Sequence, residues 1–223
     1  MNREQVLSHS TRDGTAGFIY EKVINDICGL KWDRIDRDDL INVAWVYYFF
    51  SIQFRENLET ARSLYPDDER LLELDHGERN TDNLSPWPGV AAAGEKMNHD
   101  EFMRRTIALT SVEEGRRRRL ESIGQSYLAE MRAMDRTSKA LSIASYEDGG
   151  LESVFGAILN APHWDGPSLQ AFKHFLVEHI RFDSDPDAGH GALCRHLPPD
   201  DRVLPMWSAF KRILIEAAPA LAA

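Results

Sequence analysis

The sequence is short of the features that mark several large classes of protein. Two cysteines occur in 223 residues, far apart at Cys28 and Cys194, and they form no CxxC pair. We therefore expect ordinary thiols in a reducing compartment rather than a disulfide framework. Prolines number 10 and glycines 14, and most prolines fall between apolar segments of helical period. This distribution favours helices separated by turns.

Basic charge and long apolar runs are also scarce. The chain has 26 basic and 36 acidic residues, and this net charge of −10 argues against a nucleic-acid surface. The basic run at residues 116–119 has acidic neighbours, so we interpret it as a solvated helix face. The densest apolar run, residues 43–50, is far shorter than the ~20 residues of a membrane helix. The polar N-terminus lacks a signal-peptide core. We expect a soluble, cytoplasmic protein that binds neither nucleic acid nor membrane.

Helical periodicity dominates the rest of the sequence, and no alternating strand pattern, repeat or low-complexity linker accompanies it. Acidic residues, Asn98 and a capping box from Ser111 to Glu114 mark helix starts. The expected helices cover residues 15–28, 36–65, 67–84, 98–110, 111–134, 135–159, 168–183 and 200–221. The sequence thus predicts one all-α domain over residues 1–223. It would be a bundle of seven to eight helices that follows a flexible tail of residues 1–13.

A segment near the C-terminus, FLVEHIRFDSDPDAGHGAL, has imidazole and carboxylate groups at the spacing of metal ligands. His179 and Asp183 are four residues apart and share one face of a helix, and His190 follows seven residues later. Such side chains can bind a transition metal, or they can form a hydrogen-bonded pair on a solvated helix. Pro186 cannot continue helical hydrogen bonding, which predicts a kink or break beyond Asp183.

Two further stretches supply carboxylates and imidazoles. Glu147 lies in a predicted helix that is otherwise apolar, where a buried carboxylate is costly unless it is paired or bound to a metal. Alternatively, Glu147 faces water just before a pair of glycines. Glu73 and His76 form the Glu-x-x-His pattern of diiron bundles, and Glu78 precedes His99 across a loop. We favour His99 over His76, because His99 opens a new helix and can point inward from its end.

The order of these residues resembles that of the heme-oxygenase-like diiron oxidases and oxygenases. This superfamily shares its helical fold with TenA-type thiamine-salvage proteins and pyrroloquinoline quinone synthase. Its members place a Glu and a His around the third helix, a Glu in a mid-chain helix, and a His-x3-Asp run with a further His in a late helix. The matching residues are Glu78, His99, Glu147, His179, Asp183 and His190, with Glu73 and His76 as rivals for the first pair. The resemblance extends over residues 71–190, although six residues separate Asp183 from His190 where the family has two or three.

The resemblance implies a single heme-oxygenase-like domain and an activity. Three carboxylates and three imidazoles would hold two iron ions, and the protein would activate O2 on a small organic substrate. Relatives act on amino-acid-like or fatty-acid substrates, and an external electron donor and a homodimer are compatible with such an activity. Tyr146 and Arg181 are the candidate substrate contacts. The rival hypothesis is a metal-free small-molecule pocket protein of the TenA or quinone-synthase kind, which bound iron would exclude.

Overall fold

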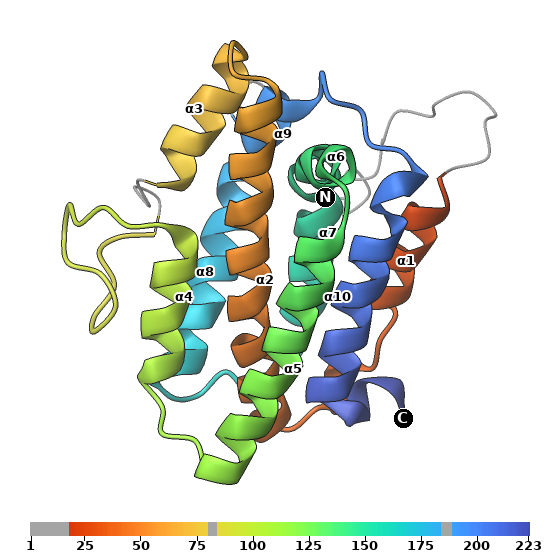
Figure 1. The fold of residues 1–223 in the computed structure, drawn as a ribbon. Coiled ribbons are helices and arrows are strands. Elements are labelled where there is room, and N and C mark those ends of the chain that lie inside the picture. The colour runs from red at the N-terminus through yellow and green to blue at the C-terminus, as the bar shows by residue number, and fades with distance from the viewer. Residues whose placement is uncertain (1–17, 80–83, 184–188) are drawn as a thin grey trace, which may run out of the picture.

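The computed structural model of this chain describes residues 18–79, 84–183 and 189–223, except for the side chain of Asp183. The predicted tail, residues 1–13, lies outside this part. The described residues form ten α-helices and no β-strand, and a single isolated bridge joins Trp87 to Ala91 (Figure 1). The helices are α1 (Ile19–Cys28), α2 (Arg37–Leu64), α3 (Glu69–Glu78), α4 (His99–Ala108), α5 (Glu114–Ala133), α6 (Arg136–Glu147), α7 (Gly150–Ile158), α8 (Pro167–Asp183), α9 (His190–Cys194) and α10 (Leu204–Ala217). The all-helical prediction is therefore confirmed for the described residues, with ten helices rather than seven or eight.

Helix α2 lies in the middle of the molecule and contacts α3, α4, α5, α6, α8 and α10 (Figure 1). Its length follows from its sequence. Asp36 caps the first turn by accepting a hydrogen bond from the backbone N–H of Asp39 at 2.8 Å. The helix then contains neither glycine nor proline until Pro66 follows its end. Its apolar side chains are buried nearly all round, as expected for a helix surrounded by others. None of the described helices is both long enough and apolar enough to cross a membrane.

The buried apolar side chains form one cluster that runs from α1 to α10. Tyr47 of α2 lies within it, with its ring centroid 5.7 Å from that of Phe155 in α7 and 5.5 Å from that of Phe175 in α8. Helices α5 and α2 pack closely against each other at Gly124. A β-carbon added at Gly124 of α5 would lie 2.1 Å from the ring of Phe49, so only glycine permits this contact.

Two predicted helices end earlier than the sequence suggested. Residues 135–159 were expected as one helix, but the chain divides them into α6 and α7 at Gly149. This glycine has a φ of 90°, in the left-handed region that residues with a β-carbon avoid. The apolar period continues on both sides of the break, which is why the pattern predicted one helix. The helix expected over 67–84 is α3, which begins after the capping residue Asp68 and ends at Glu78.

The predicted helix starts are partly correct. Asn98 occupies the N-cap position of α4, although its side chain makes no capping hydrogen bond. The capping box expected from Ser111 to Glu114 is wrong, because the N-cap residue of α5 is Glu113. Its carboxylate accepts hydrogen bonds from two backbone N–H groups of the first turn, at 2.8 and 2.9 Å. A carboxylate also suits this position because it faces the positive end of the helix dipole.

The break predicted beyond Asp183 is confirmed. Helix α8 ends at Asp183 and α9 begins at His190, while residues 184–188 lie outside the described part. Gly189 is the N-cap residue of α9 and has an extended backbone, with φ −70° and ψ 160°. One helix cannot continue through an extended residue, so His190 is oriented independently of α8. Helix α9 contacts α3 and α6 as well as α8.

Candidate metal centre

Five buried carboxylate and imidazole side chains meet inside the helix bundle. They are Glu78, His99, Glu147, His179 and His190, and each is between 5% and 8% exposed. Four of them are the first or last residue of a helix: Glu78 ends α3, His99 begins α4, Glu147 ends α6 and His190 begins α9. Their positions are therefore set by where these helices start and stop.

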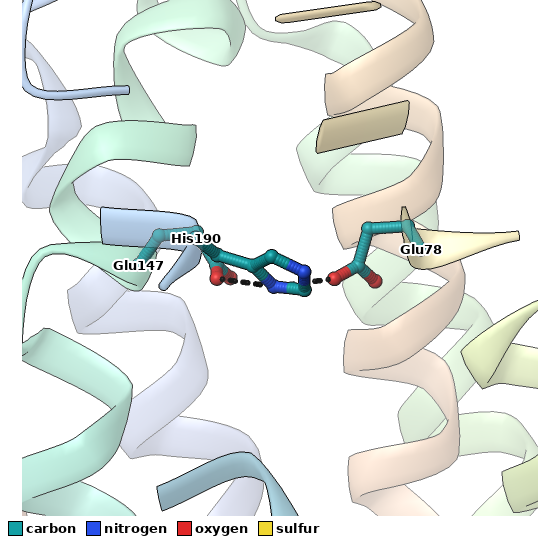
Figure 2. Close-up of side chains that lie close together, drawn as sticks. All are labelled: Glu78, Glu147 and His190. Atoms are coloured by element: carbon teal, nitrogen blue, oxygen red, sulfur yellow. Dashed lines mark hydrogen bonds and ion pairs between the residues drawn. The ribbon is translucent and has the colours of Figure 1, made fainter. Parts of the chain in front are cut away.

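His190 lies between two carboxylates (Figure 2). Its Nδ1 is 3.0 Å from Oε1 of Glu78 and 3.2 Å from Oε2 of Glu147. Figure 2 shows the two glutamates on opposite sides of the imidazole ring. One potential ligand atom from each residue lies within 4.8 Å of the others, so these three side chains could hold one metal ion.

The second oxygen of Glu78 faces a pair of histidines. Oε2 of Glu78 is 2.6 Å from Nδ1 of His99, and the same nitrogen is 3.1 Å from Nε2 of His179. Nδ1 of His179 donates a hydrogen bond to the backbone carbonyl of Phe175 at 2.7 Å, since a carbonyl can only accept. This bond leaves the lone pair of His179 on Nε2, the nitrogen that faces the cluster. The cluster thus has two halves that share Glu78.

Burial and mutual contact shift the pKa values of the cluster in different directions. Burial alone would raise the pKa of Glu78, but the imidazoles of His99 and His190 hold it well below its usual range. Burial raises the pKa of Glu147. Burial opposes the charged form of His190, yet the two carboxylates raise its pKa well above the ordinary value. Burial lowers the pKa of His179 to about 3. In the metal-free molecule, His190 therefore carries positive charge between the carboxylates, and His179 is neutral.

The donor set fits a metal ion. Nδ1 of His99 lies 2.6 Å from Oε2 of Glu78 and 3.1 Å from Nε2 of His179, so a carboxylate oxygen and two imidazole nitrogens lie close together. Within the residues that the structure describes, neither Glu78 nor Glu147 forms an ion pair with a lysine or an arginine. Buried carboxylates of this kind are stabilised by a coordinated cation. Carboxylate oxygen and imidazole nitrogen are also the donor types of nonheme iron sites.

The structure distinguishes between the two Glu–His pairs that were candidates for the first ligands. Glu78 and His99 are buried in the cluster, whereas Glu73 and His76 are exposed on α3. At ~100° per residue, position 73 is about 140° and position 76 about 160° from position 78 around the helix axis, so both face away from the cluster. Asp183 is the last residue of α8, but its side chain lies outside the described part. Five of the six predicted ligands are therefore brought together in the described structure.

A pocket adjoins the cluster and encloses about 490 Å³, its open mouth included. Four cluster residues border the pocket, and His190 is not among its lining side chains. Its apolar walls are Tyr47, Phe50, Phe54, Leu58, Leu151 and Phe175. Four charged side chains also line it: Arg55, Asp75, Arg79 and Asp100. These four were not predicted from the sequence, because charged residues on helices ordinarily face solvent.

Neither predicted substrate contact reaches this pocket. Tyr146 is fully buried and packs against Phe50 and Trp207, with ring centroids 5.1 Å away in both cases. It directly precedes Glu147 in α6, and neighbouring residues of a helix point about 100° apart. The side chain of Arg181 is 81% exposed and lies 3.9 Å from Glu178. Position 181 is two residues from His179, on the opposite side of α8.

Comparison of the chain with protein-family models, with curated proteins and with solved structures finds no match. The resemblance drawn from the order of the ligand residues therefore has no support from these comparisons. The geometry of the cluster and of its pocket is the basis for interpreting the site.

Proposed function

We propose that this protein is a nonheme diiron oxidase or oxygenase with a heme-oxygenase-like bundle, acting with O2 on a small organic substrate. The observation that carries the proposal is the shared carboxylate of Glu78. One oxygen faces His190 at 3.0 Å, and the other faces His99 at 2.6 Å. A carboxylate that presents each oxygen to a separate set of donors is suited to bridge two metal ions, as in the diiron proteins built on helical bundles.

The proposal assigns a role to each residue of the cluster. Glu147 and His190 would hold one iron ion, His99 and His179 the other, and Glu78 both. When bound, the two ions would supply the redox chemistry with O2, for which an external electron donor would provide electrons. The carbonyl of Phe175 keeps the ring of His179 in the tautomer that a metal requires. The apolar walls of the pocket would limit the access of water to the inner end.

A metal-free pocket protein is the second candidate, and one observation favours it. The carboxylates of Glu78 and Glu147 raise the pKa of His190, so this half of the cluster has a positive partner for its carboxylates without a metal. The other half is not explained in this way, because His179 is neutral and its Nε2 lies 3.1 Å from Nδ1 of His99, which itself lies 2.6 Å from Oε2 of Glu78, so that this half offers three metal donors without a positive charge from His179. This difference is the reason for placing the diiron function first.

Anaerobic titration with Fe(II) tests the proposal. We expect the protein to bind two iron ions per chain, and exposure of the loaded protein to O2 should change its optical spectrum. Glu147→Ala and His179→Ala should each lower the iron content, while far-ultraviolet circular dichroism should remain that of the helical protein. The matched control is the double variant Glu73→Gln/His76→Ala on the exposed face of α3, which should bind iron as the wild type does.

Two results would contradict this function. If both Glu147→Ala and His179→Ala bind iron as fully as the wild type, the cluster is not the metal site. A wild-type protein that binds no iron under argon, and still binds a small molecule in its pocket, would establish the metal-free alternative.

A further inference from the structure

A second cavity lies between α2, α5 and α6, which are neighbours in the bundle (Figure 1). It measures about 100 Å³, more than a single water molecule requires. The side chains of α2 that line it are Gln53, Glu56, Asn57 and Thr60. Their spacings of three, one and three residues place them on one face of the helix. None of them lines the pocket beside the cluster, so the two hollows are separate.

Gln53 is a buried polar side chain of this cavity, only 1% exposed. Its Oε1 accepts a hydrogen bond from the hydroxyl of Tyr127 at 2.9 Å. The O–H group of Tyr127 needs an acceptor, which favours this orientation of the amide. Among the residues that the structure describes, Nε2 of Gln53 has no hydrogen-bond partner. A buried N–H donor without an acceptor costs free energy, so the inner end of the cavity favours a ligand oxygen.

The outer end of the cavity has one positive charge that no lining carboxylate balances. Glu56 and Arg132 of α5 both line the cavity and form a pair with two hydrogen bonds, at 2.6 and 2.9 Å. Lys139 of α6 also lines it, and its Nζ donates to the backbone carbonyl of Arg132 at 2.7 Å. An ammonium group has three N–H donors, so two remain for another partner. The charges of the lining side chains therefore sum to one positive.

From this arrangement we infer that the cavity is a binding site for a small monocarboxylate, an inference that does not depend on the proposed function. One carboxylate oxygen would accept a hydrogen bond from Nε2 of Gln53, and the negative charge would pair with the ammonium group of Lys139. Met131 of α5, which is 1% exposed, is the apolar wall for a short alkyl chain.

Other charge types suit the cavity less well. A neutral amide could accept from Gln53, but it would leave the charge of Lys139 without a partner. An ammonium compound would meet Lys139 with a charge of the same sign. A dianion such as sulfate would bring a second negative charge into a partly enclosed space where only one positive charge is unbalanced.

Isothermal titration calorimetry of the full chain tests the inference with four compounds at constant ionic strength. They are sodium propionate, propionamide, propylammonium chloride and sodium sulfate. Propionate should bind at one saturable site, about tenfold more tightly than each of the other three. Propionamide has nearly the same shape as propionate, so this comparison isolates the charge.

Variants assign the binding to single residues. Lys139→Gln should weaken propionate binding about tenfold and leave the weaker binding of propionamide unchanged. Gln53→Glu keeps an acceptor for Tyr127 but replaces the inner donor with a carboxylate, so it should weaken the binding of both compounds. The half-buried Lys139 lies at the outer end, so its substitution tests the site even if the core does not tolerate Gln53→Glu.

Two control variants should bind propionate as the wild type does. Lys96→Gln removes the same charge from an exposed side chain that does not line the cavity. Arg55→Gln alters the pocket beside the cluster. Loss of propionate binding in Arg55→Gln would place the carboxylate in that pocket and overturn the inference.

Three further results would overturn it: no binding of propionate, propionamide or sulfate binding as tightly as propionate, or Lys139→Gln binding propionate as the wild type does. Anaerobic Fe(II)-loaded protein should bind propionate with the affinity of the metal-free protein, because the cavity shares no lining residue with the pocket beside the cluster. A chain that binds propionate in this way and binds no iron would contradict the diiron function alone.

Discussion

Gly77 lies directly before Glu78 in α3, against the ring of His190. A β-carbon at position 77 would be 3.2 Å from Nε2 of His190, which is closer than ordinary van der Waals contact. The ring of Phe182 approaches the same imidazole edge-on, with an interplanar angle of 67° and centroids 4.7 Å apart. Glu78 and Glu147 lie on opposite sides of the same ring, so His190 has neighbours in several directions and a small change at Gly77 must move the ring.

Substitution of this glycine should separate stability from metal binding. Alanine is favoured over glycine inside a helix by about 1 kcal/mol, so Gly77→Ala should leave the melting temperature of the metal-free protein unchanged or raise it. The added methyl group should displace His190 and weaken the binding of one iron ion by about tenfold. Thermal denaturation and anaerobic Fe(II) titration measure the two effects.

Gly156→Ala is the matched control for that experiment. Position 156 lies in α7, and a β-carbon there would meet nothing within 4 Å. The control should gain a similar stability while its iron affinity stays that of the wild type. Equal iron affinity for Gly77→Ala and the wild type would show that His190 can move aside without consequence.

Helix α3, which positions Glu78, is fixed at its start by Asp68. The carboxylate accepts hydrogen bonds from the N–H groups of Arg70 and Leu71 at 3.1 Å each, and it contacts Nε2 of His196 beyond α9. Burial acts to raise the pKa of Asp68, but the hydrogen bonds from His196 and the backbone outweigh it and lower the pKa. Asp68 thus connects the helix of Glu78 to the segment that follows the helix of His190.

The lowered pKa of Asp68 predicts a dependence of stability on pH. Because its folded pKa lies below the unfolded value of about 4, ionised Asp68 stabilises the fold above that pH. This contribution is lost as the pH falls through the folded pKa. Asp68→Asn retains a good capping residue without the charge. Near neutral pH the variant should be less stable by about 1 kcal/mol in urea unfolding, and the difference should shrink below about pH 4.

The exposed neighbour Asp67 provides the control. Asp67→Asn changes the net charge equally at a position that does not cap α3, so its stability should follow that of the wild type across the same range of pH. A stability difference between Asp68→Asn and the wild type that is constant over this range would mean that the ionised carboxylate contributes nothing beyond the cap.

In the molecule as a whole, the cluster inserts charged and polar groups into the apolar core that surrounds α2. Metal that binds the folded chain should therefore stabilise it by mass action, by about 2.7 kcal/mol at a free Fe(II) concentration 100 times the dissociation constant. For a chain of this length, the melting temperature should rise by roughly 5–10 °C. Anaerobic differential scanning calorimetry measures this rise, and a chelator should reverse it.

Variants identify the source of this stabilisation. The rise should be absent in His179→Ala and complete in Glu73→Gln/His76→Ala, whose substituted side chains are exposed. An equal rise in all three proteins would indicate that iron binds elsewhere on the acidic surface, since the net charge is −10.

Much of the fold could be predicted from the sequence, because periodicity, caps and helix breakers act over a few residues. The helix expected over residues 36–65 is α2, Arg37–Leu64, and the break beyond Asp183, which Pro186 predicts from the sequence, is seen at the extended backbone of Gly189. The division at Gly149 was missed, because an apolar period continues through α6 and α7 although the chain turns between them. Short-range patterns indicate which residues are helical. They do not indicate where the chain turns between two consecutive apolar helices.

For the site, the sequence supplied the residue types and their order along the chain, from Glu78 to His190. It favoured His99 over His76 but kept Glu73 and His76 as rivals, because the short and strongly charged α3 has no broad apolar face to show which side turns inward. The packing of α3 against α2 and α9 makes that choice by burying Glu78 and exposing Glu73. The sharing of Glu78 between two halves and the Arg55–Asp100 pair, 45 residues apart, likewise exist only in the folded chain. Helical period relates residues within one turn or two, whereas these contacts depend on how separate helices pack.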